Sequence, residues 1–172
     1  MPNIDFIKDI NVPHDTLVIH IRSGDIFDIP ISSYYQNPIN YYENLIKNYE
    51  NVILVTSEDQ NNPVIKVLLR NSKVKLQTSS LENDFNLLAN ARNLATSGVG
   101  TFPIAAALLS TKLKNFYYTN LFSEEHLNPK MLINNQVIHH LYTVDDNYKD
   151  KYLVTEDLKS LILDENINIY KN

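Results

Sequence analysis

Residues 16–25 read TLVIHIRSGD, and this stretch decides the fold. Its first six residues are β-branched or apolar apart from one histidine, and Ser-Gly-Asp follows soon after, which is typical of a buried strand that ends in a turn. Side chains alternate along a strand, so His20 and Arg22 point to one side and the aliphatic residues between them point to the other. The stretch therefore predicts an apolar strand that carries two basic side chains at its carboxyl end.

Strand and helix patterns alternate along the rest of the chain. Further strands are predicted at 52–56, 74–77, 94–97 and 116–119; helices are predicted from Asn37-Pro38 and from Asn62-Pro63, and at 81–93, 100–110 and 152–163. In the two Asn-Pro pairs, asparagine is a suitable helix cap and proline suits the first helical position. The alternation predicts an α/β three-layer, Rossmann-like sandwich with a mainly parallel sheet, in which residues 1–172 form a single domain.

The composition agrees with one folded domain and excludes several kinds of site. The chain has 172 residues, 44% of them apolar, which is enough for one core but not for two ordinary domains. A formal net charge of −5 gives no general attraction for nucleic acid or an anionic membrane. A phosphate-bearing ligand would need a local device, such as one arginine or a helix N-terminus.

The sequence contains no cysteine, so disulfides and thiolate metal sites are excluded. It has no Asn-x-Ser/Thr acceptor, and its first residues lack the basic segment and apolar run of a signal peptide or membrane anchor. These features favour a cytoplasmic location. No pattern of metal ligands stands out, because Glu58-Asp59 and Asp145-Asp146 read as solvated turns and His139-His140 cannot face one metal from a regular element.

Ligands of parallel α/β sheets bind beyond the carboxyl ends of the strands, where this chain places its polar clusters. The first cluster contains His20, Arg22 and Asp25. A planar guanidinium matches phosphate oxygens well, so Arg22 is a candidate ligand for a diphosphate. Alternatively, Arg22 pairs with Asp25 or Asp84 and His20 is a satisfied core histidine.

A second cluster lies at the turn Ser97-Gly98-Val99-Gly100-Thr101-Phe102, between a predicted strand and a predicted helix. Glycines permit close backbone approach, and the helix that follows presents free N–H groups to an anion. A plain helix cap is the alternative. Asp84, near the start of its own helix, either complements the helix dipole or accepts hydrogen bonds from a base edge such as that of guanine.

Together these segments resemble a known family. The residues HIRSGD, 20–25, resemble the HxRxGD motif of the α-1,2-fucosyltransferases and, more distantly, of the α-1,6- and protein O-fucosyltransferases. The segment NDFNLLANARNLATSGVGTFPIAAALL, 83–109, resembles the second motif of these enzymes, in which an Asp opens a helix and a Ser/Thr-Phe-rich turn starts the next one. The resemblance covers residues 17–109. It departs at Ser23, where α-1,2 enzymes carry a second arginine, and in the absence of any tryptophan.

The resemblance implies one half of a GT-B glycosyltransferase that binds GDP-fucose or another GDP-sugar and transfers the sugar to a glycan or protein acceptor. By position, Arg22 would bind the β-phosphate and stabilise charge on the leaving group, and His20 would line the guanosine pocket. Asp84 would read guanine. Asp25 would be a base or an orienting group.

The resemblance also implies that Ser97, Gly100 and Thr101, in the turn that ends with Phe102, hold the diphosphate at the helix N-terminus. Arginine and the helix end would replace a divalent cation, so no metal and no cofactor are expected. The acceptor-binding half that precedes this motif in the family would have to come from an N-terminal domain or a partner chain. Two other classes compete: a non-catalytic nucleotide- or sugar-binding module, and a small α/β interaction domain.

Overall fold

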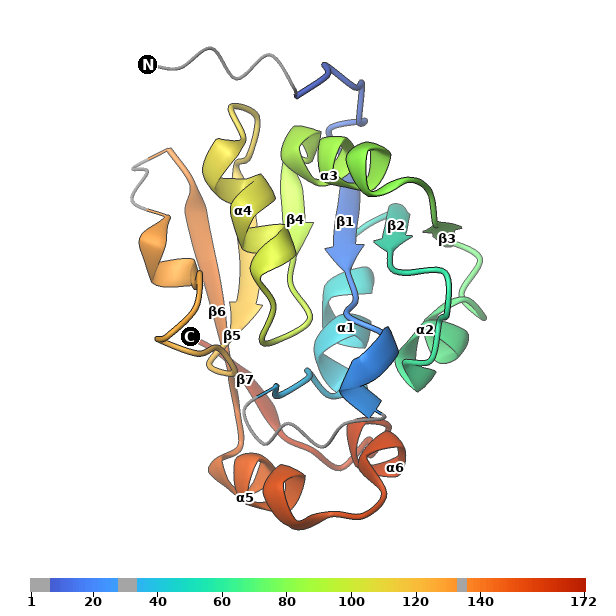
Figure 1. The fold of residues 1–172 in the computed structure, drawn as a ribbon, viewed down its shortest axis with the longest axis vertical. Helices are drawn as coiled ribbons and strands as arrows, with labels where there is room; N and C mark the ends of the chain where they lie inside the picture. Colours follow the sequence, from blue (N-terminus) through green and yellow to red (C-terminus); the bar gives the residue numbers. More distant parts are fainter. Residues whose placement is uncertain (1–6, 28–33, 133–135) are drawn as a thin grey trace.

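The computed structural model of the chain describes residues 7–27, 34–132 and 136–172. They form a seven-stranded sheet in the spatial order β3-β2-β1-β4-β5-β6-β7 (Figure 1). Neighbouring strands run parallel except β6 and β7, which are antiparallel. The strands are β1 (Thr16–His20), β2 (Asn51–Val55), β3 (Val74–Gln77), β4 (Asn93–Ala95), β5 (Asn115–Thr119), β6 (Ile138–Val144) and β7 (Ile169–Lys171).

Helices cover both faces of this sheet. Helices α1 and α2 pack on one face and α3 and α4 on the other (Figure 1). The helices are α1 (Ile39–Ile46), α2 (Pro63–Leu68), α3 (Leu81–Asn90), α4 (Thr101–Leu109), α5 (Asp146–Val154) and α6 (Leu158–Ile162), with 3₁₀ turns η1 (Gly24–Phe27) and η2 (Pro129–Met131). The fold is the predicted α/β three-layer, Rossmann-like sandwich.

Strand β1 divides its side chains between two cores. Leu17, Ile19 and Ile21 lie in the core on the side of α1 and α2, whereas Val18 lies in the core on the side of α3 and α4. The predicted alternation along this strand is therefore confirmed. His20, two residues after Val18, falls on the α3 and α4 side.

The strand order puts the start of the winding in the middle of the sheet. From β1 the chain moves outward to β2 and β3, returns to β4 beside β1, and continues to β5 and β6. The next helix after β1 lies on one face and the helix after β4 lies on the other. In doubly wound sheets the crevice at the carboxyl ends of two such strands is where ligands bind.

The two predicted Asn-Pro helix starts differ in outcome. Asn62 caps α2 as predicted, because its side-chain oxygen accepts a backbone N–H from the first turn. In α1 the cap position is held by Pro38, one residue later than predicted. The amide of Asn37 instead donates to the carbonyl of Thr96 at 2.9 Å and accepts the hydroxyl of Thr119 at 2.7 Å. Asn37 thus ties this loop to the ends of β4 and β5.

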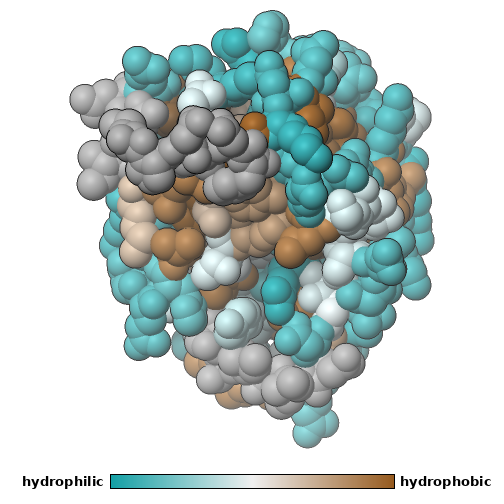
Figure 2. Space-filling model, turned by 45° about the horizontal axis from the view of Figure 1, so that its top comes forward, coloured by the Kyte–Doolittle hydropathy of each residue, from teal (hydrophilic) through white to brown (hydrophobic). Residues whose placement is uncertain are grey.

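Two predictions about α3 and α4 are wrong in detail. Helix α3 ends at Asn90, and Asn93 belongs to β4, where its amide donates to the backbone oxygens of His14 and Thr16. The segment 100–110 is apolar nearly all round, a pattern that predicts a buried helix, but α4 is not fully buried, since Leu108 retains 40% of its accessible surface. Apolar side chains gather on the surface over α4 (Figure 2).

The C-terminal region holds the largest error of the sequence prediction. The single helix expected at 152–163 is two helices, because Thr155 ends α5 and Asp157 caps α6. Strands β6 and β7 were not predicted at all. The hydroxyls of Tyr148 and Tyr152 on α5 donate to the carbonyls of Gln36 and Tyr34, which anchors this region to the loop before α1.

Among the described residues, no helix combines the length and the apolar character that a bilayer span requires.

The turn between β4 and α4 gives a test of the fold. Gly98 has φ of 106°, and an added Cβ would lie 2.3 Å from the carbonyl oxygen of Tyr35. We predict that Gly98→Ala lowers the free energy of unfolding, measured by urea denaturation, by about 2 kcal/mol or more. Gly100→Ala is the matched control, because Gly100 is extended (φ 170°) and an added Cβ meets nothing within 4 Å. Gly100→Ala should lower the free energy of unfolding by less than about 1 kcal/mol. Equal effects of the two substitutions would contradict the positive φ of Gly98 and its close approach to Tyr35.

Candidate functional site

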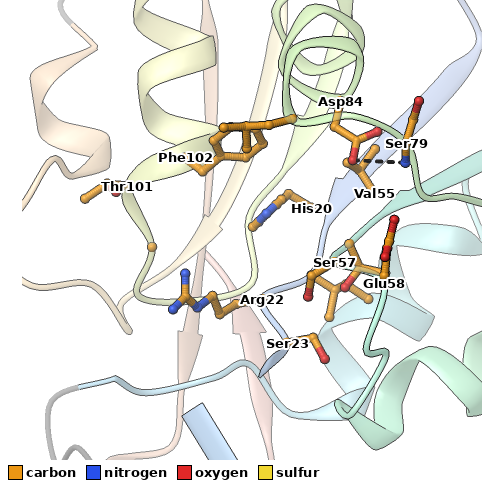
Figure 3. Close-up of a pocket in the computed structure, with 14 residues that line it drawn as sticks. His20, Arg22, Ser23, Val55, Ser57, Glu58, Ser79, Asp84, Thr101 and Phe102 are labelled. Carbon is orange, nitrogen blue, oxygen red and sulfur yellow. Dashed lines mark hydrogen bonds between the residues drawn. The ribbon is translucent and has the colours of Figure 1, made fainter. Parts of the chain in front are cut away.

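A cavity of about 400 Å³ opens at the carboxyl edge of the sheet. This volume falls in the range of ~300–1,000 Å³ that is typical of small-molecule sites. Four segments line it: residues 20–23 at the end of β1, residues 55–58 at the end of β2, Ser79 with Leu81 and Asp84 around the start of α3, and residues 100–102 at the start of α4 (Figure 3). The cavity thus lies at the point where the winding of the sheet reverses.

His20 is buried in the wall of this cavity, with 8% of its surface exposed. Its ring lies 5.5 Å from that of Phe102, centroid to centroid. Burial, together with the nearby charge of Arg22, lowers the pKa of His20 to about 3. The imidazole is therefore neutral at physiological pH, and it offers a ligand one donor and one acceptor rather than a positive charge.

Arg22 is held at the cavity by contacts to its backbone. Its N–H donates to the hydroxyl of Ser97 at 3.0 Å, and its carbonyl accepts the amide of Asn62 at 2.9 Å. Its guanidinium makes an ion pair with Asp25, with Nη2 and Oδ1 2.8 Å apart. The alternative in which Arg22 pairs with Asp25 is thus observed. The side chain keeps 40% exposure, and this pair uses only one of its five N–H donors.

Asp59 locks the loops after β1 and β2 together. Its carboxylate accepts hydrogen bonds from the hydroxyls of Ser23 and Ser57, at 2.6 and 2.8 Å, and from the backbone N–H groups of Gly24 and Asn61, both at 2.9 Å. Burial raises its pKa, but these four bonds outweigh burial and lower the pKa to about 2. The turn that reads as solvated in the sequence is therefore a built junction at the cavity.

The N-terminus of α4 enters the cavity without a side-chain cap. Gly100 holds the cap position and contributes no side-chain hydrogen bond, and Thr101 and Phe102 are the first helical residues. The N–H groups of a first helical turn have no partner within the helix. The N–H groups of Thr101 and Phe102 can therefore donate hydrogen bonds to an anion, and the positive end of the helix dipole favours its binding.

Asp84 lies in the first turn of α3, 8% exposed, on the opposite side of the cavity from Thr101 (Figure 3). Its Oδ2 accepts the N–H of Ser79 at 3.4 Å. Burial raises its pKa, while Ser79 and the nearby side chain of Gln77 oppose that rise. Its Oδ1 is buried and makes no hydrogen bond of ordinary geometry with a described residue.

Unsatisfied polar atoms concentrate at this cavity. Seven buried side-chain nitrogen or oxygen atoms of the described residues lack a hydrogen-bond partner, and four of them belong to cavity-lining residues: His20, Arg22, Thr56 and Asp84. Buried polar groups normally have partners, because leaving one without costs about 1–3 kcal/mol. A polar ligand or ordered water would supply the missing partners.

The structure brings six of the eight predicted site residues to one cavity. His20, Arg22, Asp84, Gly100, Thr101 and Phe102 all line it. The other two act on its margin: Asp25 pairs with Arg22, and Ser97 is 1% exposed, with its hydroxyl accepting the N–H of Arg22.

From the sequence, no residue after the second or third strand is assigned to the site, and Glu58 reads as part of a solvated turn. Ser57, Glu58, Ser79 and Leu81 also line the cavity. The available signal was their position just after strands of a parallel sheet, since all such ends share one edge. Within the described residues, no group of three or more His, Asp or Glu side chains is arranged to hold a metal ion.

No protein-family model matches the chain, and neither the curated proteins nor the solved structures contain a significant match. The function is therefore inferred from the chemistry of the cavity.

The burial of His20 predicts a dependence of stability on pH. In the unfolded chain the imidazole of His20 has a pKa near 6.5, whereas in the folded chain its pKa is about 3. Stability from this group is complete above pH 6.5 and falls as the pH drops toward 3, by about 2 kcal/mol between pH 6.5 and 5. Burial also lowers the pKa of His140, which adds a slope of the same sign.

His20→Gln should flatten this pH dependence of the unfolding free energy, as measured by urea denaturation at several pH values. His14→Gln, at an exposed position, controls for the loss of an imidazole. An unchanged slope in His20→Gln would show that His20 is not held neutral.

Proposed function

We propose that this chain is the donor-binding domain of a glycosyltransferase that uses a GDP-sugar, with GDP-fucose as the favoured donor. The observation that carries the proposal is the meeting of Arg22 with the uncapped N-terminus of α4 at one cavity. These segments are separated by nearly eighty positions in the sequence, yet both offer donors suited to a diphosphate.

The charges along the cavity favour a ligand that is anionic at one end and carries hydrogen-bond donors at the other. Following the sheet order, the lining comes from the start of α4, which follows β4, then from the ends of β1 and β2, and then from the segment between β3 and α3 with the first turn of α3. The β4 and β1 end carries Arg22 and the helix dipole, and therefore attracts an anion. The other end carries the carboxyl groups of Glu58 and Asp84 and therefore favours hydrogen-bond donors. A nucleoside diphosphate has this polarity.

Guanine suits the acidic end better than the other common bases. Its N1–H and N2–H₂ groups form a pair of donors, and the Oδ1 atom of Asp84 is a buried acceptor that makes no hydrogen bond of ordinary geometry with a described residue. The raised pKa of Asp84 follows chiefly from burial, and donors from a base would favour its ionised form. Phe102 and Leu81 add apolar surface to the same cavity, against which a base could pack.

In the proposed transfer step, an acceptor hydroxyl forms a bond to the anomeric carbon of the sugar while the bond from this carbon to the β-phosphate oxygen breaks. The hydroxyl proton passes to a base or to solvent, and negative charge develops on the departing GDP. Arg22 and the N–H groups of Thr101 and Phe102 would stabilise this charge. No divalent cation is required in this scheme, because the guanidinium and the helix dipole neutralise the diphosphate. The ion pair with Asp25 would orient the guanidinium, since one of its nitrogens is fixed by a carboxylate.

The rival function is a module that binds the nucleotide without turnover. One observation favours it: Asp25, the only base that the resemblance offers, is engaged with Arg22 and does not line the cavity. Mass spectrometry of GDP-fucose incubated with the chain, with and without glycan acceptors, separates the two. Release of GDP supports the enzyme, whereas binding of intact donor without release supports the module.

We predict that GDP stabilises the protein against thermal unfolding in buffer that contains EDTA. At about 100 times its dissociation constant, GDP should add about 2.7 kcal/mol, and UDP and ADP should add less. Arg22→Ala should abolish the shift, because it removes the cation of the anion subsite. Arg70→Ala is the matched control, since Arg70 is exposed and lies outside the cavity.

Two outcomes would contradict the proposed function, and a third would contradict its metal-independent mechanism. An absence of stabilisation by any nucleotide would favour an interaction domain in which Arg22 and Asp25 form only an internal ion pair. Equal stabilisation of wild type and Arg22→Ala by GDP would place the nucleotide elsewhere. A strict requirement for added divalent metal would contradict the metal-independent scheme.

Gly100→Ala should weaken GDP binding at least tenfold without a matching loss of stability. The added methyl group meets no protein atom within 4 Å and so extends into open space at the helix tip, where the diphosphate would approach the backbone. Titration calorimetry with GDP measures the effect. Unchanged affinity would argue against close approach of the phosphates to this helix end.

A further inference from the structure

Glu58 is the cavity-lining carboxylate that the preceding roles leave unused. It stands three residues beyond the end of β2, is exposed, and lines the cavity together with Arg22 and Asp84. Within the described part of the chain its carboxylate has no hydrogen bond and no ion pair. An exposed glutamate in a turn is commonly just solvated, but three features of Glu58 point to a ligand.

The loop that carries Glu58 is fixed in place. The next residue, Asp59, binds Ser23, Gly24, Ser57 and Asn61 through its carboxylate. These bonds join the loop after β2 to the loop after β1, which carries Arg22. Glu58 is therefore held at the cavity by a rigid backbone, and little ordering entropy would be lost if a ligand bound to it.

The strand order of the sheet also gives Glu58 a position suited to a ribose. The order β3-β2-β1-β4-β5-β6 is the strand order of doubly wound nucleotide-binding sheets. In such sheets an acidic residue near the end of the second strand accepts hydrogen bonds from a ribose hydroxyl. Glu58 occupies the corresponding place in this chain, directly after β2.

The arrangement of the candidate subsites along the cavity also brings a ribose near Glu58. The candidate phosphate donors come from β1 and the start of α4, and the candidate base acceptor comes from α3, beyond β3. The ribose of a nucleotide joins base to phosphate, so it lies next to the base subsite, and Glu58 belongs to the same acidic end of the cavity as Asp84. Figure 3 places Glu58 on the far side of the cavity from Thr101, where its charge would not oppose the diphosphate.

We propose that Glu58 accepts hydrogen bonds from the ribose hydroxyls of the bound nucleotide and selects ribonucleotides over 2′-deoxyribonucleotides. This inference rests on the proposed function, because it requires a nucleoside diphosphate in the cavity. It assigns to Glu58 a role in specificity and not in the chemistry of transfer.

The test compares the affinities of GDP and 2′-deoxy-GDP by titration calorimetry. Wild type should bind GDP about tenfold or more tightly than 2′-deoxy-GDP, as expected for the loss of one hydrogen bond to a charged group. Glu58→Gln should weaken GDP and bring the two affinities within about threefold of each other. Asp84→Asn should weaken both ligands in parallel and preserve the ratio, because it acts on the base. Glu156→Gln, exposed and outside the cavity, should change neither affinity.

The outcomes separate this inference from the proposed function. If wild type binds GDP and 2′-deoxy-GDP equally, or if Glu58→Gln keeps the wild-type ratio, the role of Glu58 is overturned while nucleotide binding stands. If wild type binds neither ligand, both the proposed function and the role of Glu58 are overturned.

Discussion

The structure depends on the reversal of winding between β1 and β4. The chain leaves these adjacent parallel strands toward helices on opposite faces of the sheet, so no single connection closes over their carboxyl ends. The strands are mostly apolar and buried on both faces, and His20 is the last residue of β1, so the polar side chains of this edge lie at the strand ends and in the loops beyond them. A polar cavity at this edge follows from the topology, and the identity of its residues decides what it can bind.

The cavity carries several features that oppose folding in the absence of a ligand. His20 is kept neutral by burial, Asp84 has a raised pKa, and four cavity residues each have a buried polar atom without a partner. Such costs are tolerated where the surroundings hold the groups in place. Here the hydrogen bonds of Asp59 and the amide of Asn62 fix the loops, and the hydrogen bond from the N–H of Val99 to the carbonyl of Tyr35 fixes the turn before α4. The groups are thereby positioned in advance for a polar ligand.

Much of this arrangement could be predicted from local sequence. The alternation in β1 separates Ile19 and Ile21 from His20, and a buried strand makes that pattern strict because a shift of one residue would expose its apolar side chains. The cap at Asn62 is a short-range effect of one side chain on the next turn. Six site residues could be placed at one cavity because parallel strands bring their carboxyl ends to a common edge.

The remainder depends on contacts between distant segments. Asn37 fits a helix cap by local rules, but its side-chain amide instead forms hydrogen bonds with Thr96 and Thr119. The sequence of β6 shows little apolar alternation, and the strand forms because it pairs with β5 on one side and β7 on the other. The role of Asp59 likewise depends on Ser23, 36 positions away, which no local pattern reveals.

The most direct measurement is a crystal structure of the chain with GDP bound. The account predicts the diphosphate between the guanidinium of Arg22 and the N–H groups of Thr101 and Phe102, with guanine beside Asp84. Clear density for GDP elsewhere on the molecule, or in the cavity with its base against Arg22 and its phosphates near Asp84, would contradict it.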